Sequence, residues 1–243
     1  MTAMWGYHQH SEGARLREER MTLFDVTVLV VAKAPVPGLA KTRLAAAVGP
    51  QAAADIAAAA LLDTLDAVAA APVRARVVAI AGDLAEASAS SAISAALDGF
   101  TVIPQRGIDF AHRLANAHLD AATAAGRRPV LQIGMDTPQV TADLLGGCAE
   151  TLLGVPAVLG PARDGGWWVL GVRSADMADV LRAVPMSRDD TGALTCAALR
   201  RAGIGVTCVE ELDDVDTIDD VAAVRRECSS HSRFAQATRA VGV

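Results

Sequence analysis

Short apolar runs alternate along the chain with longer segments in which apolar residues recur at helical spacing. The first run, residues 26–32, has the length and composition of a strand buried on both faces of a parallel sheet. Residues 42–70 are predicted to be helical, with a break near Gly49, because their leucines and valines recur at intervals of three and four. Further strands are predicted at residues 76–81, 100–104, 129–133, 157–159, 167–172 and 205–209.

Helices are predicted in the intervals between these strands, including residues 109–125 and 141–153. Thr141 is placed to cap the second of these helices, and Thr217 is placed to begin the final one. Alternation of strands and helices predicts a three-layer α/β/α sandwich with a mostly parallel sheet. Such sheets bind ligands in the loops at the carboxyl ends of their strands, so we expect the chemistry there.

The length of 243 residues fits one sizeable domain, which we place at residues 24–228. Residues 1–23 are polar and lack a sustained period, so they are predicted to be a disordered leader, in which His8 and His10 lack a third metal ligand. Residues 229–243 are predicted to be a flexible tail. Hydrophobic residues make up 52% of the chain but aromatic residues only 3%, so the core should consist mainly of Ala, Val and Leu.

Charge and cysteine usage restrict the compartment and the partners. The net charge is −6 and no basic stripe occurs outside one loop, which argues against nucleic acid and against an anionic membrane as partner. No apolar run reaches membrane-spanning length, and the first residues lack the pattern of a signal peptide. The four cysteines are widely spaced, as expected for reduced thiols. The sequence predicts a cytoplasmic protein and leaves its oligomeric state open.

The lysines are confined to the loop that directly follows the first predicted strand. Of the 22 basic residues only Lys33 and Lys41 are lysine, and all the others are arginine. A compact ammonium differs from a guanidinium where a point charge must fit close to phosphate oxygens. The placement of the two lysines therefore indicates a phosphate site.

The loop that carries both lysines has the features of a polyphosphate cradle. Its prolines stiffen it, Gly38 permits a tight turn, and free amide groups are expected where the next helix begins near Lys41. The glycines of a Walker loop and of a dinucleotide fingerprint are absent, and a solvated basic loop is the competing interpretation. The candidate phosphate-binding residues are Lys33, Pro35, Gly38, Lys41, Thr42 and Arg43.

Two acidic loops follow later predicted strands. Asp136 comes directly after a buried strand and is well placed to bind a divalent cation, although it could equally be a turn former or a helix cap. Asp214 and Asp216 alternate in extended chain after the last strand and so point the same way, unless they only cap the next helix. Together with the cationic loop, the two loops favour one metal–phosphate centre. This hypothesis requires Lys41 to share a cleft with Asp136 and Asp216.

A glycine-rich segment ends in two adjacent tryptophans. Gly165 and Gly166 precede Trp167 and Trp168, an arrangement typical of a pocket wall where a backbone approaches a ligand. In a strand the two indoles would face opposite sides of the sheet, so at least one is expected only to pack. Asp164 lies just before the glycines and is placed to accept a proton from an acceptor molecule.

Three motifs, in order along the chain, resemble those of one family. They are Lys33-x-Pro35-x-Pro37-Gly38-x-x-Lys41-Thr42-Arg43-Leu44, Gly134-x-Asp136-x-Pro138 and Leu159-Gly160-Pro161-x-x-Asp164-Gly165-Gly166. In these motifs the chain resembles the transferases named for association with radical-SAM and selenodomain proteins, which are labelled glycosyltransferase A-like. More distantly, Lys41-Thr42-Arg43-Leu44 and Asp214-Val215-Asp216-Thr217 resemble segments of the phospholactate guanylyltransferases. The wider similarity is to nucleotide-diphospho-sugar transferases, including the molybdenum-cofactor nucleotidyltransferases.

The resemblance implies a fold, a ligand and site residues. It implies a nucleotide-diphospho-sugar transferase fold of the glycosyltransferase A type, with a nucleotide on the N-terminal half and Mg²⁺ or Mn²⁺ held by Asp136 and Asp216. The segment Gln105-Arg106-Gly107-x-Asp109-x-x-x-Arg113 resembles a family segment that lies over the substrate. Residues 185–190 lack a tryptophan often found there in the family, which leaves the acceptor open. The acceptor-binding candidates are Arg106, Asp109, Asp164, Gly165, Gly166 and Trp167.

The leading hypothesis is a metal-dependent transferase that acts on an NTP or an NDP-sugar and a small-molecule acceptor. Lys41 and Arg43 would neutralise phosphates and Asp164 would receive the proton, which makes these three the catalytic candidates; Asp136, Asp214 and Asp216 are the metal candidates. The cationic loop suits a triphosphate and favours nucleotidyl transfer with release of pyrophosphate, whereas the family label favours glycosyl transfer. Two competing hypotheses are a non-catalytic nucleotide-binding protein and a structural interaction module.

Overall fold

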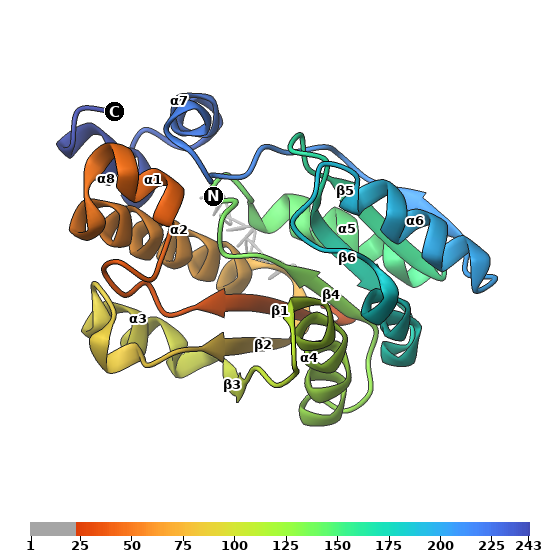
Figure 1. Ribbon diagram of the computed structural model, residues 1–243. Coiled ribbons are helices and arrows are strands. Elements are labelled where there is room, and N and C mark those ends of the chain that lie inside the picture. Colours follow the sequence, from red (N-terminus) through yellow and green to blue (C-terminus); the bar gives the residue numbers. More distant parts are fainter. Residues whose placement is uncertain (1–22) are drawn as a thin grey trace, which may run out of the picture.

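The strands form one seven-stranded sheet in the order β3-β2-β1-β4-β6-β5-β7 (Figure 1). The computed structural model describes residues 23–243, so the predicted leader with His8 and His10 lies outside the described residues, apart from Leu23. Within the described chain, β6 alone runs antiparallel, to both β4 and β5. The strands are β1 Phe24–Lys33, β2 Val73–Ala81, β3 Thr101–Pro104, β4 Val130–Ile133, β5 Ala157–Pro161, β6 Trp167–Val172 and β7 Val206–Cys208.

Helices cover both faces of this sheet (Figure 1). The layers confirm the predicted three-layer α/β/α sandwich with a mostly parallel sheet. One face is covered by α2 (Pro50–Ala70), α3 (Ser90–Ala96) and α5 (Ala142–Gly154), with the short 3-10 segments η1 (Leu84–Glu86) and η2 (Leu97–Gly99) beside α3. The other face is covered by α4 (Phe110–Ala124), the 3-10 segment η3 (Ala175–Ala183) and α6 (Thr191–Arg201).

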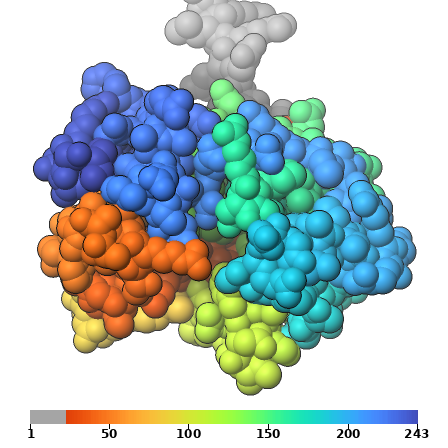
Figure 2. Space-filling model, turned by 45° about the horizontal axis from the view of Figure 1, so that its top comes forward, coloured from red at the N-terminus to blue at the C-terminus, as the bar shows by residue number. Residues whose placement is uncertain are grey.

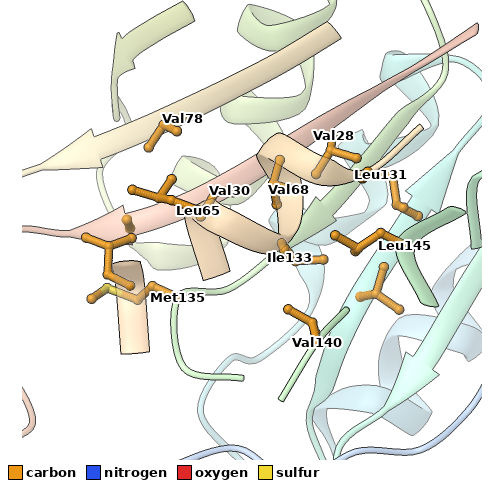
Figure 3. Packing of buried hydrophobic residues seen from close by; sticks show 14 of the residues in the cluster. Val28, Val30, Leu65, Val68, Val78, Leu131, Ile133, Met135, Val140 and Leu145 are labelled. Atoms are coloured by element: carbon orange, nitrogen blue, oxygen red, sulfur yellow. The ribbon is translucent and has the colours of Figure 1, made fainter. Parts of the chain in front are cut away.

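The central strand β1 explains why its sequence is so apolar. Val28 and Val30 face the layer of α2, where they pack with Leu65 and Val68 (Figure 3). The alternate residues, such as Leu29, pack against the layer of α4 on the opposite face. Because both faces of the strand are buried, every position favours an apolar side chain and no alternation is visible in the sequence.

Predicted helix boundaries coincide with specific capping groups. Thr141 caps α5, its side chain accepting a hydrogen bond from the backbone N–H of Leu144. Thr217 begins α7 (Ile218–Glu227) and forms a capping box with Asp220. The predicted helix of residues 42–70 is broken at Gly49, whose φ of 85° ends α1 (Thr42–Val48) before α2 begins. These boundaries were readable because caps and breaks are local in the sequence.

The last fifteen residues differ from the flexible tail that the sequence predicted. They contain a further helix, α8 (Arg233–Ala240), which packs on the outer side of α2. Phe234 is fully buried among residues of α1, α2 and α7, and the carboxylate of Asp63 accepts hydrogen bonds from the backbone N–H groups of Arg233 and Phe234. The helix α7 is therefore not the final one.

All four cysteines are free thiols. Among residues 23–243 no helix combines the length and the apolar character needed to cross a membrane.

Candidate functional site

A cavity of about 930 Å³ opens at the carboxyl ends of the parallel strands. In Figure 2 the orange, blue, cyan and yellow-green segments meet around a hollow in the middle of this face. The loops after β1, β4 and β5 and the loop that follows β7 contribute to it, and antiparallel β6 begins at the same edge. The predicted site residues that line it are Lys33, Lys41, Thr42, Arg43, Asp136, Asp164, Gly166, Trp167, Asp214 and Asp216.

Lys41 is at the centre of the charged part of the cavity. Its backbone is left-handed, with φ of 46° and ψ of 51°, and it directly precedes α1. Its Nζ donates to Asp136 Oδ2 at 2.5 Å and to the backbone carbonyl of Val215. Burial by itself would lower the pKa of the ammonium, but Asp136, with Asp216 and Asp214 nearby, raises that pKa above its usual value. Lys41 therefore does share a cleft with Asp136 and Asp216.

The other cations of the loop have different partners. Arg43 forms a 2.6 Å ion pair with Asp216 at the rim of the cavity. Lys33 Nζ donates to the carbonyl of Leu39 at 2.7 Å, which closes the loop on itself. Gly38 has a φ of 78°, as expected for the tight turn predicted there. Pro35 does not line the cavity; its carbonyl accepts a hydrogen bond from the backbone N–H of Ser88 and so anchors the loop.

Carboxylates from three loops face the same space. Burial, followed by the negative charge of Asp164, raises the pKa of Asp214 to about 6, although Lys41 opposes this shift. Asp164 Oδ1 accepts a hydrogen bond from the backbone N–H of Gly166 at 2.7 Å, which holds that carboxylate at the cavity wall. The carboxylates of Asp136, Asp164, Asp214 and Asp216 therefore outnumber the two cations, Lys41 and Arg43, that pair with acids in this cavity.

The oxygen atoms around Lys41 fit a divalent ion of the Mg²⁺ or Mn²⁺ type. They are carboxylate oxygens, which such ions prefer. The hydroxyl of Thr137, beside Asp136, is buried at the cavity and has no hydrogen-bond partner among the described residues. Within residues 23–243 no three His, Cys, Asp or Glu side chains form a ready-made metal cluster. Mg²⁺ usually takes only one or two protein carboxylates and completes its shell with phosphates and water, so this donor set is sufficient.

The glycine pair before β6 serves a close approach between two backbone segments. Gly165 has a φ of 90°, and a Cβ built there would lie 1.8 Å from the carbonyl oxygen of Asp189. The N–H of Gly192 also donates to the carbonyl of Gly165 at 2.8 Å. The sequence interpretation, a backbone approaching a ligand, applies to Gly166, which lines the cavity, whereas Gly165 meets protein.

The two adjacent tryptophans face opposite sides, as predicted. Trp168 is 2% exposed, packs in the core beneath α2 and α5, and donates its indole N–H to the carbonyl of Glu210 at 2.7 Å. Trp167 packs toward the α4 layer and lines the cavity. Both residues contribute to the cavity lining, but Trp168 is almost wholly buried, so Trp167 is the more exposed of the two there.

Two acceptor-binding candidates bond to the protein itself. Arg106 pairs with both carboxylate oxygens of Asp120, at 2.7 and 2.6 Å. Asp109 caps α4 by accepting from the N–H and the ring of His112, and these hydrogen bonds lower its pKa. Neither side chain lines the cavity. From the same segment, the cavity is lined by Gln105, Phe110 and Arg113.

Sequence reasoning missed Gln132 entirely and left Arg113 out of the site candidates. Gln132 is in β4 between apolar neighbours, lines the cavity, and is 1% exposed. A glutamine inside an otherwise apolar buried strand was the signal that could have identified it, because burying an amide costs free energy unless the amide is hydrogen-bonded. Arg113 ends the segment of residues 105–113 that resembles the family, but nothing in the sequence distinguished it from Arg106.

Comparisons with known proteins agree with this fold. A family model described as "Uncharacterized protein conserved in bacteria (DUF2064)" matches residues 64–188. None of the curated proteins matches the chain. A candidate nucleotide-diphospho-sugar transferase from Desulfovibrio desulfuricans G20 superposes with a TM-score of 0.76 and 26% identity, covering 89% of this chain and 96% of that one. The similarity confirms the predicted nucleotide-diphospho-sugar transferase fold.

Two more distant structures share the fold alone. Rv0371c from Mycobacterium tuberculosis H37Rv, solved as a complex with manganese, has a TM-score of 0.50 and 21% identity, over 82% of this chain and 97% of that one. A nucleotidyl transferase from Methanothermobacter thermautotrophicus has a TM-score of 0.54 and 17% identity, over 87% of this chain and 98% of that one. The fold thus occurs both in a nucleotidyl transferase and in a protein that binds manganese. The specific resemblance to the radical-SAM-associated transferases is not among these matches.

Proposed function

The chain belongs to the bacterial family DUF2064, and from that premise we propose that it is a metal-dependent transferase acting on a nucleotide-activated substrate, with nucleotidyl transfer as its reaction. One observation carries the proposal: the ammonium of Lys41 lies 2.5 Å from the carboxylate of Asp136 in a cavity that Asp214 and Asp216 also line. A cationic loop and a surplus of acids in one cleft suit a triphosphate together with a divalent ion. The nucleotidyl transferase and the manganese complex among the structural relatives support the same interpretation.

In this reaction the protein mainly positions groups and neutralises charge. Lys41 and Arg43 exchange their carboxylate partners for phosphate oxygens, and the amide groups of the lysine loop add further donors. An oxygen of the acceptor attacks the α-phosphorus and forms a new P–O bond. The bond from that phosphorus to the oxygen that bridges to the β-phosphate breaks, and pyrophosphate leaves. The proton of an acceptor hydroxyl passes to Asp164, which lies at the cavity wall.

Asp136 and Asp216 are the residues that would hold the divalent ion, with Asp214 and the Thr137 hydroxyl beside them. When bound, Mg²⁺ or Mn²⁺ supplies positive charge to the phosphate oxygens on which negative charge develops. With Asp136 engaged in this way, the ammonium of Lys41 would be available to the phosphates. Lys33, held by Leu39, keeps the loop in its compact form.

Glycosyl transfer from an NDP-sugar is the second candidate. It is favoured by the Desulfovibrio relative, whose description is that of a nucleotide-diphospho-sugar transferase and which is 26% identical. The same cavity would then hold the diphosphate, and the acceptor would attack the sugar carbon instead of a phosphorus. The leaving group distinguishes the two reactions, because it is pyrophosphate in one and a nucleoside diphosphate in the other.

A thermal-shift screen of NTPs and NDP-sugars, with and without Mn²⁺, tests the proposal. A ligand at a hundred times its dissociation constant should stabilise the fold by about 2.7 kcal/mol. Asp136→Ala should remove the Mn²⁺-dependent part of the shift. Asp219→Ala is the matched control, because Asp219 is an exposed aspartate on α7 that does not line the cavity.

The outcomes are separable. A shift with an NTP that needs Mn²⁺ and Asp136, followed by release of pyrophosphate with an acceptor, supports nucleotidyl transfer. Release of a nucleoside diphosphate from an NDP-sugar supports the second candidate. Binding without release of either product indicates a non-catalytic nucleotide-binding protein. If Asp136→Ala responds like the parent, the metal assignment is wrong.

A further inference from the structure

The cavity has two sides with different chemistry. The lysine side is formed by Lys41, Arg43, Asp136, Asp214 and Asp216, and the α4 side is formed by Val31, Arg113, Leu114, Gln132, Trp167 and Met186. The lysine side is the one that the proposed function uses for phosphates and metal. The α4 side lies on the opposite face of the sheet edge, where Val31, Leu114, Trp167 and Met186 belong to the core beneath α4. Its role is still to be explained.

Gln132 is a buried amide without a partner on the α4 side. It pairs in register with Leu29 of β1 and Leu170 of β6, so its side chain shares their face of the sheet. Its Oε1 has no hydrogen-bond partner among the described residues, although the residue is only 1% exposed. Buried amides that lack partners are rare, because an amide that is removed from water and makes no hydrogen bond destabilises the folded protein. An amide kept at such a position is explained by a ligand that completes its hydrogen bonds.

Arg113 is a cation that lines the same cavity and has no hydrogen-bond partner for its buried Nε among the described residues. It is in the first turn of α4, and its Nε is buried and makes no hydrogen bond with any described residue. Its guanidinium lies 5.5 Å from the centroid of the Phe110 ring. Asp109, four positions earlier, already accepts hydrogen bonds from the backbone N–H and the ring of His112. A guanidinium with its donors free is suited to a carboxylate or a phosphate, which it binds through two parallel hydrogen bonds.

Three polar residues that line the cavity near the α4 side already bond to the protein. Gln105 donates to the carbonyls of Ala32 and Ala79, and Thr191 donates to the carbonyl of Pro185. At the exposed rim, Arg188 is held by both carboxylate oxygens of Asp190, with Asp189 next to it. Within the described chain, Arg113 and Gln132 are therefore the residues of the α4 side that have buried polar atoms without a hydrogen-bond partner.

We propose that Arg113 and Gln132 form the acceptor subsite, and that the acceptor is a small molecule with an anionic group, either a carboxylate or a phosphate. Arg113 binds that anion, and Gln132 bonds to a neighbouring hydroxyl or carbonyl of the same molecule. The apolar walls made by Val31, Leu114 and Met186 limit the acceptor to a compact skeleton. This inference rests on the proposed function, since it names the class of molecule that receives the transferred group.

The test measures stabilisation of the protein by simple anions. The probes are glycerol 3-phosphate for the phosphate arm, D-glycerate for the carboxylate arm and uncharged glycerol as the reference, all at equal ionic strength. Arg113→Gln removes the charge and keeps a side chain of similar polarity. Arg182→Gln is the matched control, because Arg182 also packs against α4 but bonds to Asn116 and Asp179 outside the cavity.

We expect a saturable increase in Tm with one of the two anionic arms and none with glycerol. Arg113→Gln should raise the dissociation constant of that probe about 10- to 100-fold, as expected for loss of a charge-assisted hydrogen-bonded pair, whereas Arg182→Gln should bind it like the parent. The arm that binds identifies the anionic group. The proposal is overturned if neither arm stabilises the parent, if glycerol does so equally, or if Arg113→Gln binds the probe unchanged.

Gln132→Leu gives an independent readout. Removing an unsatisfied buried amide should raise the Tm of the free protein while weakening the anionic probe about tenfold. A lower Tm combined with unchanged probe binding would contradict the role of Gln132.

The NTP-dependent shift of each variant separates the two proposals. If NTPs shift the parent and anions do not, only the subsite fails; if anions bind through Arg113 and no nucleotide does, only the proposed function fails.

Discussion

The lysine side and the α4 side of the cavity satisfy their polar groups in opposite ways. On the lysine side, cations and acids pair with one another, as Lys41 does with Asp136 and Arg43 does with Asp216. On the α4 side, Arg113 and Gln132 keep buried polar atoms that no described residue satisfies. A ligand on the lysine side must exchange existing ion pairs, whereas a ligand on the α4 side only adds hydrogen bonds.

This difference has a consequence for how the two ligands affect stability. Exchange of one charged partner for another leaves the number of satisfied groups nearly unchanged, so much of the binding energy of the nucleotide is offset by the lost pairs. Satisfying an orphaned amide and guanidinium removes an existing cost of the folded protein. The α4 side should therefore gain more stability per hydrogen bond from its ligand than the lysine side gains.

Gly165 holds the loop with Asp164 against the segment before α6, both of which line the cavity, and its replacement should have the largest effect. Gly165→Ala places a Cβ against the backbone of Asp189 at a position with positive φ, so the loop with Asp164 and the segment before α6 must separate. We expect a loss of about 3 kcal/mol in the free energy of unfolding, measured by urea denaturation. Gly147→Ala is the control, because a Cβ there meets nothing within 4 Å and alanine favours the helix α5.

If Gly165→Ala unfolded at the same urea concentration as the parent, the backbone of Asp189 would not lie close enough to Gly165 to exclude a Cβ. The same variant should weaken nucleotide and anionic probes together, because it displaces two segments that line the shared cavity. An effect on only one class of ligand would show that the two sides are held independently.

Lys41→Met addresses the lysine side alone and should have the next largest effect. Loss of the ammonium should raise the dissociation constant of the NTP that gives the largest thermal shift by about 10- to 100-fold. Lys33→Met is the comparison, since the ammonium of Lys33 is bonded to the carbonyl of Leu39 and not to the acids. Because Lys33 lacks a charged partner, we expect its replacement to change the dissociation constant of the NTP less than about tenfold. Isothermal titration with the NTP and Mn²⁺ measures both.

Binding of Mn²⁺ alone gives the opposite expectation for Lys41→Met. Without the ammonium, Asp136 is left as an unpaired carboxylate, so the variant should bind Mn²⁺ at least as tightly as the parent. Weaker Mn²⁺ binding in Lys41→Met would mean that the lysine organises the acids for the metal, and the exchange of ion pairs described above would be the wrong picture.

Much of the fold was predictable because its signals are local. Apolar runs gave the strands, and Gly49, Thr141 and Thr217 gave helix boundaries within a few residues. The loops with Lys41, Asp136 and Asp214 were predictable as neighbours because the carboxyl ends of parallel strands meet at one edge of the sheet. The single antiparallel strand β6 did not disturb this, since it begins at that same edge.

What the sequence did not reveal depends on partners that are distant along the chain. Arg106 and Arg113 are equivalent in the sequence, and only the nearby Asp120 distinguishes the paired one from the unpaired one. Gly165 has no room for a side chain because the backbone of Asp189, which is 24 positions later, lies against it. Phe234 follows no long apolar period, so its burial against α2 could not be read from α8 alone.

His118 provides a smaller test of the α4 side, through the helix that carries Arg113. It is fully buried in α4, and burial lowers its pKa to about 3. Below pH 6.5 the unfolded chain takes up a proton that the folded protein does not, so this histidine makes stability fall as the pH is lowered from about 6.5 towards 3. The slope is about 1.4 kcal/mol per pH unit, or about 2 kcal/mol between pH 6.5 and 5. His118→Leu should remove this loss in urea denaturation, and exposed His231→Leu should not. Since Asp214 titrates in the parent and in His118→Leu alike, the difference between their pH dependences of the free energy of unfolding isolates His118. Equal pH dependences in the two proteins would mean that α4 opens enough for water to reach the ring.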